Sequence, residues 1–138
     1  AQGLGNTLAL LEADEHQCNE ALMLSHDGKL SEAASGNVFW FHSRTLFTPA
    51  LTSDCLAGTT RATVMRLSPY PVEECLVAPD ELSRAECVFL TNCNWLILPV
   101  TSLNPQGWNW PATHAVMSEL TNLLKADIKQ YNEQQRHA

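Results

Sequence analysis

Three short polar stretches of the chain have residue types that suit binding of a small, flat, anionic molecule. The first, residues 31–40, places one carboxylate, Glu32, among small residues between two β-favouring runs. Small neighbours would let a planar ligand approach that carboxylate closely. A plain surface glutamate at the end of a strand would give the same pattern, because exposed Glu is the rule in proteins.

The second stretch, residues 56–61, places Gly58, Thr59 and Thr60 just before a segment with helical spacing. The N-terminus of a helix presents backbone N–H donors and the positive end of the helix dipole, which suits a phosphate group. The same residues could simply cap the helix, with Thr59 or Thr60 as N-cap of a helix that begins at Arg61. The two interpretations are compatible.

The third stretch is Thr91-Asn92-Cys93-Asn94, which lies between two apolar runs. Four consecutive side chains that can form hydrogen bonds are more than a simple hairpin requires. The alternative is a turn built from ordinary turn residues.

Short strands and a few helices must position these stretches. Hydrophobic patterning and turn residues such as Asp27-Gly28 and Ser43-Arg44 set the expected boundaries. Strands are expected at residues 20–25, 30–33, 37–42, 45–48, 72–77, 87–91 and 95–100, with a loop at 102–110. Helices are expected at residues 8–15, 61–67, 79–85 and 113–134.

The helix expected at 61–67 should turn Ala62, Val64 and Met65 inward. The last helix is amphipathic and should fray from Tyr131. Its apolar stripe consists of Val116, Met117, Leu120, Leu123, Leu124 and Ile128. This mixture of elements predicts an α+β fold, or a small α/β layer fold.

Composition excludes several classes of protein. The 138 residues are 45% hydrophobic, enough for one domain over residues 1–138, and the net charge of −7 argues against a nucleic-acid partner. No apolar run is long enough for a membrane span. The cysteines, Cys18, Cys55, Cys75, Cys87 and Cys93, form no CxxC pair, and the histidines are scattered. We therefore expect no metal site and reduced thiols in a cytoplasmic protein.

Taken together and in order, several blocks of the sequence resemble the class IV, or fold type IV, pyridoxal-phosphate-dependent aminotransferases. That family includes branched-chain and D-amino-acid aminotransferases and aminodeoxychorismate lyase. The resemblance covers nearly the whole chain. The matching blocks are residues 20–24 with Asp27-Gly28, Ser31-Glu32 followed by 36–39, residues 46–49, Leu56-x-Gly58-x-Thr60-Arg61, and residues 86–92 with Pro99-Val100.

The resemblance implies roles for individual residues. Glu32 would pair with the pyridine nitrogen of pyridoxal 5'-phosphate and keep it protonated, so that the ring can accept electrons from the substrate. Gly58, Thr59 and Thr60 would hold the phosphate. Cys93 stands where many members have a Thr or Ser that touches the phosphate or the substrate carboxylate, so the resemblance places it in the cofactor-binding set. Because a thiol is a weaker donor, either Cys93 makes that contact or Thr91, Asn92 or the backbone makes it instead. Arg61 would serve the helix and its packing.

The resemblance also implies parts that these residues do not supply. The family's lysine, which forms a Schiff base with the cofactor, would fall at or just before Ala1, whereas the lysines present are Lys29, Lys125 and Lys129. The segment after the second helix, residues 67–71, is shorter than is usual in the family. We therefore expect the large C-terminal domain of a longer enzyme that forms a homodimer, without its smaller N-terminal domain.

The expected function is that of an amino-acid aminotransferase, which acts on an amino acid and a 2-oxo acid. One alternative is aminodeoxychorismate lyase, which acts on aminodeoxychorismate to make 4-aminobenzoate for folate synthesis, and which the Phe39-Trp40 pair and the Thr91-Asn92 loop would suit. Another is a stand-alone ligand-binding relic with no catalysis, which the missing lysine would permit.

Overall fold

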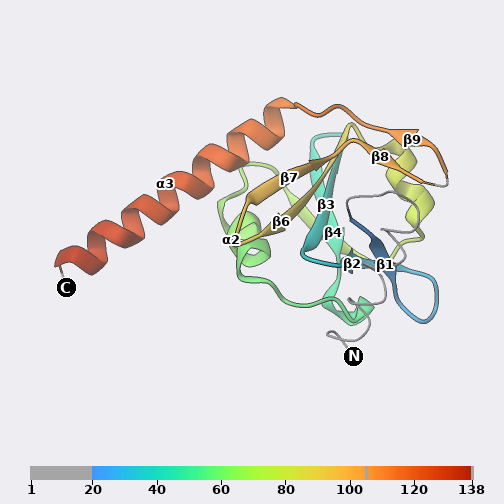
Figure 1. Cartoon of the computed structure of the whole chain (residues 1–138), viewed down its shortest axis with the longest axis horizontal. Coiled ribbons are helices and arrows are strands. Elements are labelled where there is room, and N and C mark those ends of the chain that lie inside the picture. Colours follow the sequence, from blue (N-terminus) through green and yellow to red (C-terminus); the bar gives the residue numbers. More distant parts are fainter. Residues whose placement is uncertain (1–19, 105, 138) are drawn as a thin grey trace.

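A five-stranded mixed sheet forms the centre of the chain in the computed structural model, which describes residues 20–104 and 106–137. Its strand order is β5-β4-β3-β6-β7. Only β4 and β5 run parallel, and the other neighbours are antiparallel. The strands are β3 (Asn37–His42), β4 (Thr45–Pro49), β5 (Val72–Cys75), β6 (Cys87–Asn92) and β7 (Leu96–Val100) (Figure 1).

The two central strands are buried on both faces, because alternate side chains of a strand point to opposite sides. In β3, Phe39 and Phe41 face one cluster, whereas Val38 and Trp40 face the other. Strand β6 repeats this pattern, and the rings of Phe39 and Phe89 stack with their centroids 5.4 Å apart. The sheet therefore separates two apolar cores.

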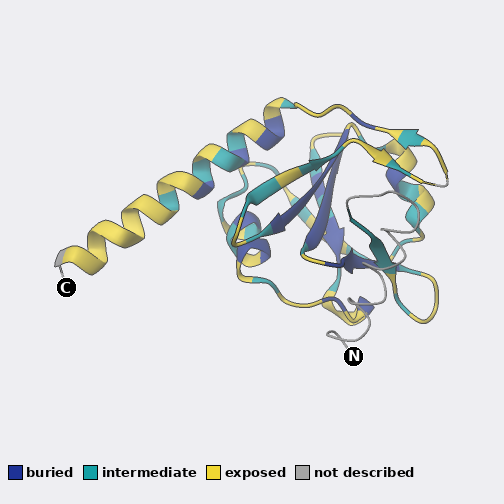
Figure 2. Ribbon diagram, in the orientation of Figure 1, coloured by how far each residue is buried: buried dark blue, intermediate teal, exposed yellow. Residues whose placement is uncertain are grey.

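Two helices cover the first face of the sheet. They are α2 (Thr59–Leu67) and α3 (Ala115–His137), and the core beneath them includes Val64, Val116 and Leu120. The first half of α3 lies against the sheet, and its outer half extends away from the body with almost every residue exposed (Figures 1 and 2).

Smaller elements cover the opposite face. They are the hairpin β1 (Leu22–Leu24) and β2 (Leu30–Ala33), the 3-10 helix η2 (Pro79–Arg84), and the hairpin β8 (Ser102–Leu103) and β9 (Trp108–Asn109). Leu30, Leu82 and Trp110 belong to this second core. A further 3-10 helix, η1 (Leu51–Ser53), lies in the loop between β4 and α2.

The predicted α+β class is confirmed, and most of the predicted strands are present with slightly different ends. Strand β4 extends through Pro49, because β5 pairs in parallel beside it and Pro49 lies opposite Cys75. The loop expected at 102–110 contains the hairpin β8–β9. Strands β1 and β2 form a separate two-stranded sheet beside the central one.

The helices differ more from the prediction. The first, at residues 8–15, lies outside the described residues, and the segment 79–85 forms a 3-10 helix. In α2 the buried residues are Thr60, Arg61 and Val64, whereas Ala62 is exposed. Helix α3 continues to His137 instead of fraying at Tyr131, although Ile128 and Tyr131 are largely exposed.

Candidate cofactor site

A hollow of about 480 Å³ lies where the β2–β3 turn, the loop before α2 and the β6–β7 turn meet. All three polar stretches singled out in the sequence contribute to its lining. The lining residues are Glu32–Asn37, Leu56–Thr60 and Thr91–Cys93. Segments that are far apart in the chain therefore form one concave site.

Glu32 is a buried carboxylate in the wall of this hollow, with only 3% of its surface exposed. Strand β2 holds it opposite Met23 of β1. Its Oε1 accepts a hydrogen bond of 2.6 Å from the Leu56 N–H, and its Oε2 accepts none from the residues that the structure describes. Burial raises the pKa of the Glu32 carboxyl, and the Leu56 N–H partly offsets that rise.

Asn37 connects the strands to the loop that precedes α2. It is 4% exposed, lies at the start of β3 and pairs across the sheet with Thr91. Its Nδ2 donates a hydrogen bond of 2.7 Å to the carbonyl oxygen of Leu56. The same carbonyl accepts the N–H of Gly58 at 3.0 Å, so Leu56 is held at both its amide and its carbonyl group.

Two glycines lie where the segments around the hollow approach closely. A Cβ at Gly58 would meet Asn37 Oδ1, so the Asn37 side chain would have to shift. Gly36 is confined more strictly, because a Cβ there would clash with the backbone carbonyl oxygen of Thr91. Two glycines therefore let the three segments around the hollow approach one another closely.

The N-terminus of α2 faces the hollow without a side-chain cap. Gly58 is the N-cap residue and offers no side chain, and Thr59 and Thr60 are the first two helical residues. The alternative interpretation, in which Thr59 or Thr60 caps a helix that begins at Arg61, is therefore wrong, because the helix begins two residues earlier than expected. Ala62 donates its N–H to Gly58, but the N–H groups of Thr59, Thr60 and Arg61 find no acceptor among the described residues.

Arg61 follows the hollow but does not line it. Its side chain is 5% exposed, and Nη2 donates to the Pro49 carbonyl oxygen at 3.1 Å and to Glu74 Oε1 at 2.7 Å. The arginine thus ties the first turn of α2 to β4 and β5, as expected of a residue that serves the helix.

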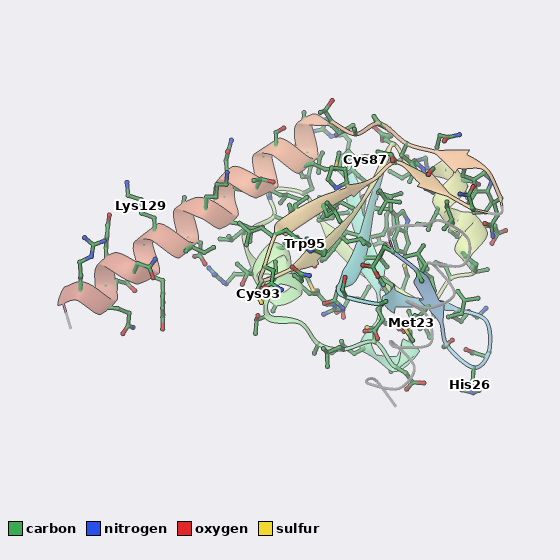
Figure 3. The ribbon with its side chains drawn as sticks, in the orientation of Figure 1. Met23, His26, Cys87, Cys93, Trp95 and Lys129 are labelled. Atoms are coloured by element: carbon green, nitrogen blue, oxygen red, sulfur yellow. The ribbon has the colours of Figure 1, made fainter. Side chains whose placement is uncertain are left out.

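The β6–β7 turn supplies the third wall. Thr91 is buried, and its Oγ1 has no hydrogen-bond partner among the described residues. Asn92 instead holds the turn itself: Nδ2 donates to Ser35, and Oδ1 accepts the N–H groups of Asn94 and Trp95. Cys93 is exposed and lies beside α2 at the edge of the hollow (Figure 3).

All of the positions predicted as cofactor-binding line this one hollow, namely Glu32, Gly58, Thr59, Thr60, Thr91, Asn92 and Cys93. The single motifs gave no reason to select Asn37 and Leu56, whose importance lies in contacts between distant segments. Both stand inside the blocks of the family resemblance, which was the available signal.

The chain's three lysines lie outside the hollow. Lys29 is in the β1–β2 turn, and Lys125 and Lys129 are on the outer part of α3, with Lys129 far from the hollow in Figure 3. Within the described ranges, no group of three or more His, Cys, Asp or Glu residues could hold a metal ion. Neither described α-helix combines the length and apolarity needed to cross a membrane.

The family comparison and the curated relatives of the chain agree with each other. Residues 2–103 match the family described as amino-transferase class IV. The D-alanine aminotransferase of Bacillus licheniformis is 31% identical over 131 residues, a match that covers 90% of this chain and 46% of that protein. The chain therefore spans about half the length of the curated relatives it matches.

Solved structures agree with this result. A branched-chain amino acid aminotransferase from Thermobaculum terrenum in its PLP form superposes with a TM-score of 0.81 and 29% identity, over 87% of this chain and 40% of that one. A putative 4-amino-4-deoxychorismate lyase from Legionella pneumophila gives a TM-score of 0.82 and 26% identity, over 90% and 47%. The fold type IV architecture predicted from the resemblance is confirmed.

Proposed function

Since the chain belongs to the class IV aminotransferase family, we propose that its hollow holds pyridoxal 5'-phosphate and that it forms the cofactor-binding portion of an amino-acid aminotransferase. The observation that carries the proposal is the arrangement of the hollow. A buried carboxylate, Glu32, and the uncapped N-terminus of α2 line the same concave surface.

The residues present fit both parts of this cofactor. The N–H groups of Thr59, Thr60 and Arg61, which have no acceptor among the described residues, suit a phosphate, because a helix N-terminus binds anions. The Thr91 hydroxyl, likewise without a partner in the described ranges, offers a further hydrogen bond. Oε2 of Glu32 suits a protonated ring nitrogen, and Leu56, 60% exposed at the rim, offers an apolar surface to a ring.

When bound, the cofactor would supply an electron sink for carbanion chemistry at the amino acid. The chain's own residues would bind and orient it. Ionised Glu32 would hold a proton at the ring nitrogen. The hydrogen bond that its Oε1 accepts from the Leu56 N–H fixes the direction of the carboxylate. The α2 N-terminus would anchor the phosphate.

The remaining parts of the enzyme belong to the same proposal. None of the chain's lysines lines the hollow, so the proposal assigns the reacting lysine and the smaller N-terminal domain to protein outside these 138 residues. It also assigns amino acids and 2-oxo acids as substrates, a homodimeric assembly and a cytoplasmic location. The short length relative to the relatives supports this division.

The test is a comparison of ligands that differ only in phosphate. We expect calorimetric titration to give at least tenfold tighter binding of pyridoxal 5'-phosphate than of pyridoxal, because only the former reaches α2. Thr60→Val should reduce that ratio. Thr63→Val, one turn along the same helix and outside the hollow, is the matched control. Equal affinity for the two ligands, or no binding of either, would contradict the proposal and favour the relic.

Aminodeoxychorismate lyase is the second candidate, favoured by the TM-score of 0.82 to the Legionella structure. The two reactions share the cofactor and differ in their products. Incubation of the protein encoded by the complete gene with aminodeoxychorismate, and separately with an amino acid and a 2-oxo acid, distinguishes them. Release of 4-aminobenzoate without amino-group transfer would identify the lyase.

A further inference from the structure

We propose that Asn37 is a positioning residue that couples Glu32 to the phosphate-binding end of α2 through the backbone of Leu56. The inference rests on the proposed function, because it concerns how the same hollow is held in shape. Nothing in the polar motifs themselves selected Asn37, whose Nδ2 donates to the Leu56 carbonyl oxygen in the loop before α2.

A continuous chain of hydrogen bonds links the two ends of the hollow. Glu32 Oε1 accepts from the Leu56 N–H at 2.6 Å, and Asn37 Nδ2 donates to the Leu56 carbonyl at 2.7 Å. That carbonyl also accepts the N–H of Gly58 at 3.0 Å. One peptide segment thus connects the carboxylate at one end of the hollow to the N-cap of α2 at the other.

The side chain of Asn37 also has a steric role. Its Oδ1 occupies the space where a Cβ of residue 58 would lie, so the amide packs directly against the N-cap backbone. Its backbone pairs with Thr91 of β6, which places the asparagine in contact with all three walls of the hollow.

The two side chains that hold Leu56 are themselves buried. Asn37 and Glu32 are 4% and 3% exposed, whereas Leu56, which both of them reach, is 60% exposed. A buried polar group that loses its partner pays the full cost of desolvation. Without the Asn37 donor, the Leu56 carbonyl would keep only its hydrogen bond from the Gly58 N–H. The loop whose N–H aligns Glu32 would then be held less firmly.

The test uses Asn37→Asp, which keeps the shape but turns the donor facing Leu56 into an acceptor. We expect about a tenfold to hundredfold loss of affinity for pyridoxal 5'-phosphate. The loss for pyridoxal should be smaller, so that the ratio of the two affinities falls. A role confined to stability would lower both affinities by the same factor and leave that ratio unchanged.

Asn109→Asp is the matched control, because Asn109 also donates Nδ2 to a backbone carbonyl, that of Gly107, but is exposed and outside the hollow. It should leave both affinities unchanged. If circular dichroism shows that Asn37→Asp does not fold, Asn37→Ser serves instead, with a smaller loss and the same fall in the ratio.

The outcomes separate this inference from the proposed function. A wild-type protein that prefers pyridoxal 5'-phosphate, together with folded Asn37 variants whose affinity ratio is unchanged, overturns the role of Asn37 alone. A wild-type protein with no such preference overturns both. A reduced ratio in the Asn37 variants, with Asn109→Asp unaffected, supports the coupling.

Discussion

The N-termini of α2 and α3 solve the same physical problem in opposite ways. Every α-helix begins with N–H groups that lack partners inside the helix. At the start of α3, His114 supplies acceptors for these N–H groups. Its Nδ1 accepts the Val116 N–H at 3.1 Å, and its carbonyl oxygen accepts the Ser118 N–H at 3.2 Å. At the start of α2, Gly58 provides no side chain, and the first N–H groups find no acceptor within residues 20–104 and 106–137.

The difference extends to the surroundings of the two helix ends. Beside α2 stand Thr91, whose buried hydroxyl has no hydrogen-bond partner in the described part of the chain, and Glu32, whose Oε2 accepts no hydrogen bond from that part. Beside α3, His114 packs against the ring of Phe41, and its Nε2 lies 3.8 Å from Glu86 Oε1. Unsatisfied polar groups are rare and costly in folded proteins. Among the described residues, three buried side-chain atoms lack a hydrogen-bond partner, and one of them, Thr91 Oγ1, lines the hollow, where we expect a ligand to complete it.

The largest effect should come from a change at the open helix end. Gly58→Ala would force a Cβ against Asn37 Oδ1, and we expect the free energy of unfolding to fall by about 1–3 kcal/mol because of overpacking. Displacement of the N-cap should also weaken binding of pyridoxal 5'-phosphate about a hundredfold, a loss of roughly 2.7 kcal/mol. Urea denaturation and calorimetry measure the two effects.

A remote glycine provides the control for this variant. Gly107 has φ +73, and a Cβ added there would meet nothing within 4 Å, so Gly107→Ala should cost stability through backbone strain alone, by about 1 kcal/mol. It should leave cofactor affinity unchanged. If Gly58→Ala bound the cofactor like Gly107→Ala, the open end of α2 would not be the phosphate site.

A change at the capped helix end should have the reverse profile. His114→Ala removes the acceptor for the Val116 N–H and should lower the free energy of unfolding by about 1 kcal/mol. Affinity for pyridoxal 5'-phosphate should not change. His114→Asn, which retains a capping oxygen, should recover most of the lost stability in thermal denaturation. A loss of cofactor affinity in either variant would contradict the division between the two helix ends.

The two helix ends also show what can be predicted from sequence. The predicted bounds of strands β3 and β6 agree closely with the structure, since their continuous apolar runs are typical of buried strands and local patterning is enough to detect them. The predicted start of α2 lies two residues too late, because Thr59 and Thr60 are good caps by type. Their neighbour Gly58 is the N-cap because Asn37, far away in sequence, packs against it.

In the candidate site, too, local patterning selects some residues and misses those whose contacts are distant in the sequence. Glu32, Gly58 and Thr91 can be selected by residue type and by the family resemblance. The roles of Asn37 and Leu56 depend on hydrogen bonds between residues 19 and 24 positions apart, to which local periodicity is insensitive. The exposure of Ala62 has a similar origin, since Arg61 takes the inward position to reach Glu74.

The smallest effect on stability should come from Glu32→Gln. This variant tests whether Glu32 serves ligand binding and not the stability of the fold. Burial raises the folded-state pKa of Glu32. Between the ordinary pKa of glutamate and this higher value, the folded protein holds a proton that the unfolded chain has released. The free energy of unfolding therefore falls as the pH rises through this window, and the contribution of the protonated group is complete only below it.

The glutamine of the Glu32→Gln variant cannot titrate, yet its Oε1 can still accept the Leu56 N–H, so the variant should fold normally. Its free energy of unfolding relative to wild type should increase as the pH rises from the ordinary pKa of glutamate through the raised pKa of Glu32. The same substitution should abolish most activity of the complete enzyme, because a neutral amide no longer favours a protonated ring nitrogen. Urea denaturation across this pH range checks the first effect, and turnover checks the second. Retained turnover would refute the assignment of Glu32, whereas a stability difference that shrinks as the pH rises would show that burial does not disfavour its carboxylate.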